Sequence, residues 1–390
     1  MADLQTDVLV VGGGPAGTTA AHQLAARGVS VTLIDRAHFP RDKTCGESLS
    51  PGAIARLAAL DIWRPAQSQD AHREDGAGRT LRGMRIRSPR GITFRGLYKE
   101  GGAGLAIRRI EFDRALLESA RGRGVRVLEG LEATSAEQTP DGEAVVHARD
   151  LGHGQTRRIT ARRVVVADGR RSFLARQLGF IEAIEVAADR RYAVRAHCTS
   201  VGGLSDLAEM QVGAGGYCGI APLGDTAANV CYVLFTDRLD MRPSDLPSDF
   251  RRHLRAFPEV TERLQNSKIE GEISVIGPLR LRSRRQSSGP FIACGDTTGF
   301  LDPFTGEGIA HAIASGALGA EAVGASLDRT PGAFRNYELR VRRLRRVKGA
   351  AARLLYGLVS RRRLADSAAT VFSRLPGLGN AVVRLFGDQI

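Results

Sequence analysis

The sequence has few of the residues that mark a disulfide-bonded, metal-binding or membrane-spanning protein. Its five cysteines are odd in number and scattered, and they lack the Cys-x-x-Cys or Cys/His spacing of a zinc site. No apolar run approaches the roughly 18 residues of a spanning helix. The first strand begins almost at once, which leaves no room for a signal peptide. We therefore expect a cytoplasmic protein with no disulfide framework and no metal site.

Lysine is also scarce, because only 4 of the 56 basic residues are lysines although the net charge is +14. A basic surface can neutralise nucleic-acid phosphates, but no nucleic-acid motif accompanies this charge. An arginine bias fits codon usage equally well, so we expect no nucleic-acid partner. The 390 residues, 43% of them hydrophobic, can form about two globular domains.

Glycine is abundant where the first strand ends. The apolar residues 8–11 predict a strand buried on both faces, and GGGPAG (12–17) follows it. Gly12, Gly14 and Gly17 fit G-x-G-x-x-G, which provides a tight turn, close approach to a pyrophosphate and close helix packing. Residues 18–27 are rich in helix formers, so the N-terminus of this helix points at the phosphates.

The second strand, residues 29–34, ends at Asp35. An acid in this place, about 20 residues beyond the glycines, accepts hydrogen bonds from a ribose of the dinucleotide. Asp35 favours FAD or NAD over NADP, although the neighbouring Arg36 weakens that preference. Together these elements predict a complete dinucleotide site.

A polar loop, residues 38–51, separates this unit from the next helix. A loop beside a cofactor strand is expected to lie over a site. Its one cysteine, Cys45, is either a partly buried thiol without function or a thiol that faces the ligand. Later in the chain, the apolar strand 163–166 runs into Asp168-Gly169, which predicts ligand contact at the carboxyl edge of the sheet.

The second half of the chain changes to a strand-rich pattern and then resumes the strand and helix pattern of the first domain. Alternation over residues 190–285 predicts an antiparallel sheet with one inserted helix at 248–265, and residues 81–95 predict a hairpin outside the dinucleotide domain. A buried strand then ends at Gly295-Asp296. The long helix that begins at Ile309 presents its N-terminus to a ligand that becomes negative.

The C-terminal residues 336–390 are helical in pattern and strongly basic. Leu339, Val341 and Leu344 alternate with arginines. Such a segment is either a solvated helix packed on the body or a surface that contacts anionic lipid. Peripheral membrane contact through these helices therefore stays open beside the cytoplasmic location.

Three separated motifs stand in a fixed order: GGGPAG, VVVADGRRS and GDTTGFLDPFTGEG. Together they resemble the flavoprotein superfamily of group A monooxygenases, geranylgeranyl reductases and flavin-dependent halogenases, with the p-hydroxybenzoate hydroxylase fold. The resemblance covers about residues 5–325. It implies an α/β fold with an FAD-binding Rossmann-like domain, an inserted mixed or antiparallel β-sheet substrate domain, and a helical C-terminal region.

The predicted domains are discontinuous in sequence. Residues 1–75, 105–180 and 286–335 are assigned to the FAD-binding domain. Residues 76–104 and 181–285 are assigned to the substrate domain, and 336–390 to the basic helical region.

The resemblance also implies which residues hold the cofactor. They are Gly12, Gly14, Pro15, Ala16, Gly17, Asp35, Arg36, Arg109, Asp168, Gly169, Gly295, Asp296, Pro303, Gly306, Glu307, Gly308 and Ile309. Asp296 is expected at the ribityl or pyrophosphate part, and Gly306 to Gly308 at the flavin ring. Arg109 matches a family arginine near the cofactor, with Arg108 as an alternative. Asp168-Gly169 matches a motif linked to both FAD and NAD(P)H, so NAD(P)H is the expected reductant.

Within the superfamily, the segments point to different branches. FPRDKTCGE and DPFTGEGI resemble the geranylgeranyl reductases, in which a cysteine at the place of Cys45 lies near the flavin, whereas GESLSP is closer to halogenases and hydroxylases. GYCGIAP has Gly219 where those reductases carry tryptophan, which counts against polyprenyl reduction. Halogenases carry Trp-x-Trp-x-Ile-Pro, and Trp63 is the only tryptophan here, which counts against halogenation.

The favoured function is an FAD-dependent monooxygenase that uses NAD(P)H and passes an oxygen atom, via a flavin hydroperoxide, to an apolar or aromatic small molecule. The first alternative is the reduction of C=C bonds in a polyprenyl or other lipid substrate, and the second is a flavin-binding assembly module without turnover. Cys45, Glu47 and Ser48 are the expected active-site residues of the loop, with Glu47 as an acid or base. The oligomeric state is not predicted.

Overall fold

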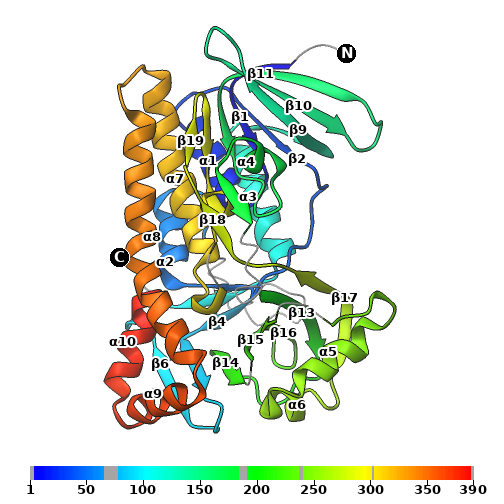
Figure 1. Ribbon diagram of the computed structural model, residues 1–390, viewed down its shortest axis with the longest axis vertical. Coiled ribbons are helices and arrows are strands. Elements are labelled where there is room, and N and C mark those ends of the chain that lie inside the picture. Colours follow the sequence, from blue (N-terminus) through cyan, green and yellow to red (C-terminus); the bar gives the residue numbers. More distant parts are fainter. Residues whose placement is uncertain are drawn as a thin grey trace.

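The computed structural model describes residues 4–65, 78–183, 191–213, 215–236, 240–300 and 303–387. Two large sheets lie one above the other in the view of Figure 1, and the long helix α8 (Ala333–Val359) runs beside them. The predicted fold class is confirmed. The predicted domain boundary between residues 75 and 76 lies outside the described residues.

The first sheet has eight strands, with the order β19-β20-β11-β1-β2-β8 along its main path. Its strands are parallel except for β19 and for the pair β9 and β10, which extends the sheet beside the first part of β11. The bounds are β1 (Leu4–Val11), β2 (Val31–Asp35), β8 (Arg126–Glu129), β9 (Leu131–Gln138), β10 (Ala144–Asp150), β11 (Thr156–Val166), β19 (Ser287–Ser288) and β20 (Phe291–Ala293).

Both faces of this sheet are covered, as its apolar, β-branched strands require. Val8 and Val10 pack on one face against α1 (Pro15–Ala25), α3 (Arg109–Gly122) and α7 (Gly308–Leu327). Leu9 and Val11 belong to a second core on the other face, with α4 (Phe173–Gln177) and the inner residues of β9 and β10. Helices α1 and α7 touch closely, because a Cβ built at Gly316 would lie 2.3 Å from the carbonyl oxygen of Ala16.

The second sheet has seven strands in the order β17-β13-β16-β15-β14-β5-β6. It is mixed, because β5 and β14 pair in parallel while its other pairs are antiparallel. The predicted hairpin of residues 81–95 is confirmed as the pair β5 and β6. The bounds are β5 (Gly83–Arg87), β6 (Thr93–Leu97), β13 (Arg191–Thr199), β14 (Leu207–Gly213), β15 (Gly216–Pro222), β16 (Ala228–Phe235) and β17 (Lys268–Ile276).

The single helix predicted for residues 248–265 is wrong. The structure has two helices, α5 (Leu246–Leu254) and α6 (Pro258–Arg263). Phe257 between them has φ −129° and ψ 80°, because a residue before proline is driven out of the helical region. Both helices pack on the second sheet through a core that includes Phe250 and Val260.

Short elements connect the two sheets. A three-stranded sheet joins β3, β7 and β4, and β12 pairs with β18. The helix α2 follows β3, and its first turn is capped by the Ser50 side chain. The bounds are β3 (Ser48–Leu49), β4 (Arg79–Leu81), β7 (Gly104–Ala106), β12 (Ile181–Ala183), β18 (Leu281–Ser283), α2 (Pro51–Ala59), η3 (Pro243–Asp245), η4 (Gly295–Thr298) and η5 (Pro303–Thr305).

The C-terminal region forms α8, α9 (Arg362–Arg374) and α10 (Pro376–Gly387). Helix α10 lies against β6, where a Cβ at Gly96 would come within 2.3 Å of the Val383 side chain. Helix α9 meets the same strand through Phe372 and Phe94, whose ring centroids are 5.0 Å apart. None of the helices within the described residues is long and apolar enough to span a bilayer.

Candidate functional site

The carboxyl ends of the central strands meet at one edge of the first sheet. In the strand register, Val11 lies beside both Ile34 and Val166, and Val166 lies beside Ala293. The residues that follow these strand ends therefore share one edge, and they include Gly12, Asp168 and Gly295, with Asp35 ending β2. This is the place where open parallel sheets bind their ligands.

The turn after β1 requires glycine at two places. Gly12 has φ +108°, and a Cβ there would lie 2.5 Å from the carbonyl oxygen of Ala167. A Cβ at Gly17 would lie 1.9 Å from the carbonyl oxygen of Gly12. With any other residue at position 17, α1 could therefore not start so close to β1. The turn is also tied to β2, because Gly13 N donates to Asp35 Oδ2 at 2.7 Å. Asp35 therefore holds the turn as well as facing the site.

Two adjoining cavities open at this edge. The first, of about 470 Å³, is lined by residues that include Gly12, Asp35, Arg36, Arg41 and Asp168. The second, of about 250 Å³, is lined by residues that include Cys45, Arg109, Asp296, Gly306 and Gly308. Lys43, Thr44 and Arg170 line both, so one path leads from Asp35 to the start of α7.

The residues on this path fit FAD. A Cβ built at Gly306 meets no atom within 4 Å, and one built at Gly14 meets none closer than 3.6 Å, so the backbone of both glycines faces open space. The N-termini of α1 and α7 border the cavity, and such ends favour bound anions. Among the described residues predicted for the cofactor, only Gly17 and Glu307 line neither cavity.

Sequence reasoning missed two cations beside this path: Lys43, which lines both cavities, and Arg41, which lines the first. Burial lowers the pKa of the Lys43 ammonium, and Asp296 opposes that effect. Arg41 Nη1 lies 2.9 Å from Asp113 Oδ2. A pyrophosphate on this path would have both as positive partners, and the basic residues of FPRDKTCGE were the only sign of them in the sequence.

Asp168 lies at the end of the first cavity with an altered acidity. Desolvation raises the pKa of its carboxyl to about 6, and a hydrogen bond with Ser172 opposes the rise. The side chain is nevertheless exposed to the cavity, so water screens part of the effect. Asp168 therefore holds its proton to a higher pH than an ordinary aspartate.

This raised pKa predicts a pH-dependent gain in stability for Asp168→Asn in the protein without FAD. Between the ordinary pKa of 3.8 and about 6, the folded state keeps a proton that the unfolded chain has lost. Ionisation of Asp168 therefore lowers the free energy of unfolding as the pH rises from 3.8 to about 6. Below 3.8 the carboxyl is protonated in both states and this loss is absent. After discounting for solvent, we expect the variant to gain on the order of 1 kcal/mol at alkaline pH.

Urea unfolding at acidic and alkaline pH measures this difference. Asp141→Asn, in the exposed turn between β9 and β10, is the control and should change the free energy of unfolding at neither pH. Equal stability of Asp168→Asn and the parent protein at alkaline pH would show that the carboxyl is not desolvated.

Arg109 and Cys45 lie together at the wall of the second cavity. Arg109 is 4% exposed and donates to both oxygens of Asp113, at 2.8 and 2.7 Å. Burial alone would lower the pKa of this guanidinium, but Asp113 and Cys45 together raise it above its usual range. Arg108 points elsewhere and pairs with Glu270 at 2.8 Å, so Arg109 is the arginine that faces the cavity.

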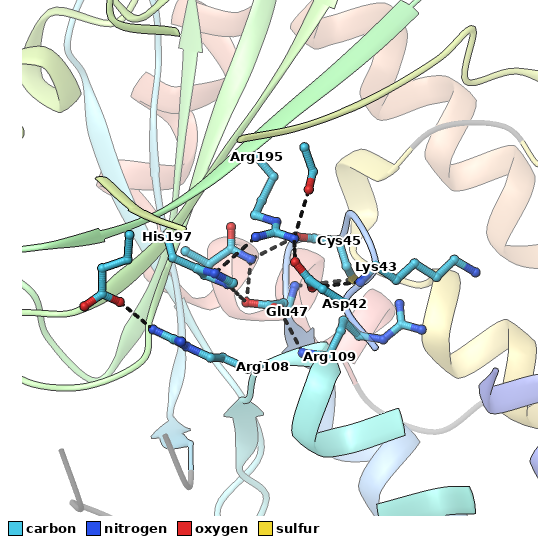
Figure 2. A network of polar contacts seen from close by, with 11 residues as sticks. Asp42, Lys43, Cys45, Glu47, Arg108, Arg109, Arg195 and His197 are labelled. Carbon is cyan, nitrogen blue, oxygen red and sulfur yellow. Dashed lines mark hydrogen bonds and ion pairs between the residues drawn. The ribbon is translucent and has the colours of Figure 1, made fainter. Parts of the chain in front are cut away.

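Glu47 is at the centre of a buried polar network (Figure 2). Its Oε1 accepts a hydrogen bond from Arg109 N at 2.8 Å. Its Oε2 lies 2.7 Å from His197 Nε2 and accepts from Asn229 Nδ2 at 2.8 Å. Arg195 Nη1 lies 3.1 Å from His197 Nδ1, and since arginine only donates, Nδ1 accepts and Nε2 carries the proton toward Glu47.

This network holds the loop that carries Cys45. Glu47 itself has φ 55°, a conformation that non-glycine residues seldom adopt. Asn229 Nδ2 also donates to the carbonyl oxygen of Cys45 at 2.9 Å, and Arg195 pairs with Asp42. The loop is therefore fixed to β13 and β16 of the second sheet and to the start of α3. Both oxygens of Glu47 are engaged, so its contacts favour a positioning role, and acid or base chemistry at Glu47 stays a prediction.

Ser48 was predicted beside Cys45 and Glu47 as an active-site residue. It begins β3 and lines the second cavity. The structure thus brings the three predicted loop residues to the same wall, while a catalytic role for Ser48 stays a prediction.

The second cavity becomes apolar away from Cys45. Met84, Met210, Tyr217 and Phe304 contribute to its lining, as do Val383 and Phe386 of α10. Gly219 lines it as well, and a Cβ there would meet its nearest atoms, both backbone oxygens, at 3.7 Å. A methyl group at position 219 would therefore be accommodated at the cavity wall.

Comparisons with known proteins agree with this geometry. A protein family described as FAD binding domain matches residues 5–318. Menaquinone reductase of Mycobacterium tuberculosis is 31% identical over 339 residues, which cover 82% of this chain and 76% of that protein. Digeranylgeranylglycerophospholipid reductase 2 of Methanosphaera stadtmanae is 28% identical over 325 residues, covering 80% of this chain and 76% of that protein.

Solved structures show the same fold. A flavin-dependent brominase superposes with a TM-score of 0.82 at 21% identity, covering 98% of this chain and 93% of that one. A geranylgeranyl bacteriochlorophyll reductase-like protein of Thermoplasma acidophilum gives 0.74 at 22% identity, covering 100% and 93%. At these identities the likeness concerns the fold alone.

Proposed function

Since this chain belongs to the FAD binding domain family and is an FAD-dependent oxidoreductase, we propose that it uses NAD(P)H to reduce C=C bonds in a polyprenyl or similar lipid substrate. The observation that carries the proposal is the second cavity, whose apolar part leads directly to Cys45. The two reductases named above are similar over most of this chain and bear the names of enzymes with isoprenoid lipid substrates. The sequence alone favoured a monooxygenase over a C=C reductase, and the proposal reverses that order.

Reduction of a C=C bond needs a proton as well as a hydride, and Cys45 is placed to donate that proton. Bound FAD, once reduced by NAD(P)H, supplies the hydride. The Cys45 thiol lines the cavity, and Sγ accepts a hydrogen bond from Glu47 N at 3.4 Å. If Sγ gives its proton to the second carbon of the double bond, the remaining thiolate is stabilised by this N–H and by the Arg109 guanidinium. The apolar wall excludes water and holds the alkene beside Cys45.

The test is an anaerobic stopped-flow measurement on the purified yellow protein. The protein is reduced with NADPH or NADH and mixed with a polyprenyl alkene or with a menaquinone, and flavin absorbance is followed. Reoxidation by the alkene in the absence of oxygen, with a product two hydrogens heavier, is the expected result. No anaerobic reoxidation, together with an oxygenated product in air, would overturn the proposal.

The monooxygenase is a second candidate because of Gly219. The resemblance to geranylgeranyl reductases implies a tryptophan at this place, and Gly219 instead leaves cavity space that an aromatic substrate can fill. The same stopped-flow experiment decides between the two, since only oxygen transfer requires air.

Gly219→Trp should narrow the cavity. We expect kcat/KM for a substrate with a bulky ring, such as a prenylated naphthoquinone, to fall about tenfold or more, and kcat/KM for an acyclic polyprenol to fall less. Gly219→Ala is the control, because the 3.7 Å spacing accepts a methyl group. Equal effects of Gly219→Trp on both substrates would place position 219 outside the substrate path.

A further inference from the structure

Helix α9 has two apolar faces, and only one is covered. Its inner face buries Ala365 and Ala369 and packs on Phe94 of β6 through Phe372. Asp366 on the same side accepts from Ser88 Oγ at 2.7 Å and from Arg90 N at 2.9 Å. Docking of α9 on the protein is therefore explained by this inner face alone.

The neighbouring face of α9 carries apolar side chains toward solvent. Leu364 and Val371 are seven residues apart, two helical turns, and lie on one side of α9, and Leu375 directly follows the end of the helix. Leu378 and Leu385 repeat the seven-residue spacing on α10. We call these five residues the outward stripe, and each of their side chains is at least 40% exposed. Exposed apolar residues gathered in this way mark an interaction surface.

Arginines stand at both ends of α9, next in sequence to the outward stripe. Arg361, Arg362 and Arg363 stand at the start of α9, and Arg374 at its end. All four are exposed, and within the described ranges none has an ion-pair partner. An apolar stripe beside unpaired cations is the pattern that helices use at an anionic lipid surface.

Helix α10 connects this surface to the second cavity. Val383, Phe386 and Gly387 line the cavity, while Leu378 and Leu385 of the same helix face outward. In Figure 1, α9 and α10 lie together at one corner of the molecule, against β6. One helix thus forms both the cavity wall and part of the exposed apolar surface.

We propose that the outward stripe and the arginines around it bind the surface of an anionic membrane, which places the α10 wall of the cavity at the lipid. The membrane-binding proposal is argued from the geometry of α9 and α10. Only the passage of a lipid substrate past α10 rests on the proposed reductase function. Leucines enter the headgroup region while the arginines meet lipid phosphates, so apolar and charged contacts act together. An apolar substrate would then pass between the bilayer and Cys45 along the α10 side of the cavity.

The test is co-sedimentation of the full FAD-loaded chain with vesicles. Vesicles of phosphatidylglycerol and phosphatidylcholine should sediment the protein, vesicles of phosphatidylcholine alone should do so weakly, and high salt should release it. The triple variant Arg361→Gln, Arg362→Gln, Arg363→Gln should lower the partition coefficient about a hundredfold. Leu375→Ser with Leu378→Ser should lower it about tenfold or more.

Matched control variants distinguish binding by this surface from a general effect of the protein's basic charge. Arg114→Gln, Arg126→Gln and Arg335→Gln together remove the same charge from exposed positions outside α9 and α10, and Leu151→Ser removes an exposed leucine from the turn between β10 and β11. Neither should change sedimentation by more than about twofold. The yellow FAD absorbance of every variant reports that it is folded.

Three results would overturn the proposal. They are absence of sedimentation with anionic vesicles, equal loss in the control variants, and a stripe variant that changes the oligomeric state without changing vesicle binding. The last result would assign the stripe to contact with a second copy of the chain. Vesicle binding by a protein that reduces no alkene would overturn the proposed function and leave the membrane surface intact.

Discussion

Replacing Cys45 with alanine is expected to abolish most of the turnover while leaving the flavin in place. Cys45 Sγ lines the cavity beside Arg109, and the proposed reaction needs a proton from it. A general acid of this kind accelerates the reaction about 10²- to 10⁴-fold, so we expect kcat to fall about a hundredfold or more. FAD content and the rate of flavin reduction by NAD(P)H should stay within about twofold, because neither needs this proton. Steady-state turnover and stopped-flow reduction measure the two effects separately.

Cys231 provides the matched control, since it is a second cysteine that lines the same cavity. Burial raises the pKa of its thiol to about 12, so it gives up a proton far less readily than an ordinary thiol. Cys231→Ala should therefore keep turnover within about threefold. A Cys45→Ala variant that reduces alkenes at the parent rate would show that the proton comes from elsewhere.

Replacing Glu47 with alanine is expected to have the largest effect on stability. The change leaves three buried donors, on Arg109 N, His197 and Asn229, without their carboxylate. Unsatisfied buried donors cost about 1–3 kcal/mol each, so we expect the free energy of unfolding to fall by about 3 kcal/mol or more. Urea unfolding followed by flavin release and by circular dichroism measures the loss.

Glu47→Gln distinguishes positioning from acid or base chemistry. An amide has one oxygen and one NH₂, so in either orientation it places a donor against a donor, and an intermediate loss of stability is expected. Glu321→Ala removes an exposed glutamate that pairs with Arg340 and should cost less than about 1 kcal/mol. A Glu47→Gln variant with the stability of the parent, no turnover and an altered pH profile would identify Glu47 as the catalytic acid or base.

The sequence predicted the first sheet well because its signals are local. The glycines after β1, the acid at the end of β2 and the apolar strand before Asp168 each occupy a few adjacent residues, and parallel pairing places them together. β9 was missed because LEATSAEQ has few β-formers and depends on its pairing with β10. The helix 248–265 was predicted as one because helix-forming residues outweighed Pro258, whose effect on Phe257 breaks it.

The polar network could not be predicted from sequence spacing. His197 and Asn229 lie on neighbouring strands, β13 and β16, and face a loop 150 and 182 residues earlier in the chain. Glu47 looked like a free acid because nothing in GESLSP indicates its partners. Lys43 was passed over for the same reason, since only the folded loop brings it to Asp296 and the cavity junction.

The close packing of α7 on α1 has a consequence for the order of synthesis. When synthesis reaches Asp168, the glycine turn and Asp35 have been made, but β20 and α7 have not. α7 supplies the wall of the cofactor path at Gly308 and packs on the backbone of Ala16 through Gly316. The nascent chain therefore carries an unfinished nucleotide fold, with the apolar face of α1 uncovered, through the translation of β13 to β17 of the second sheet. The cofactor path is therefore complete only after β20 and α7 have been made, near the end of the chain.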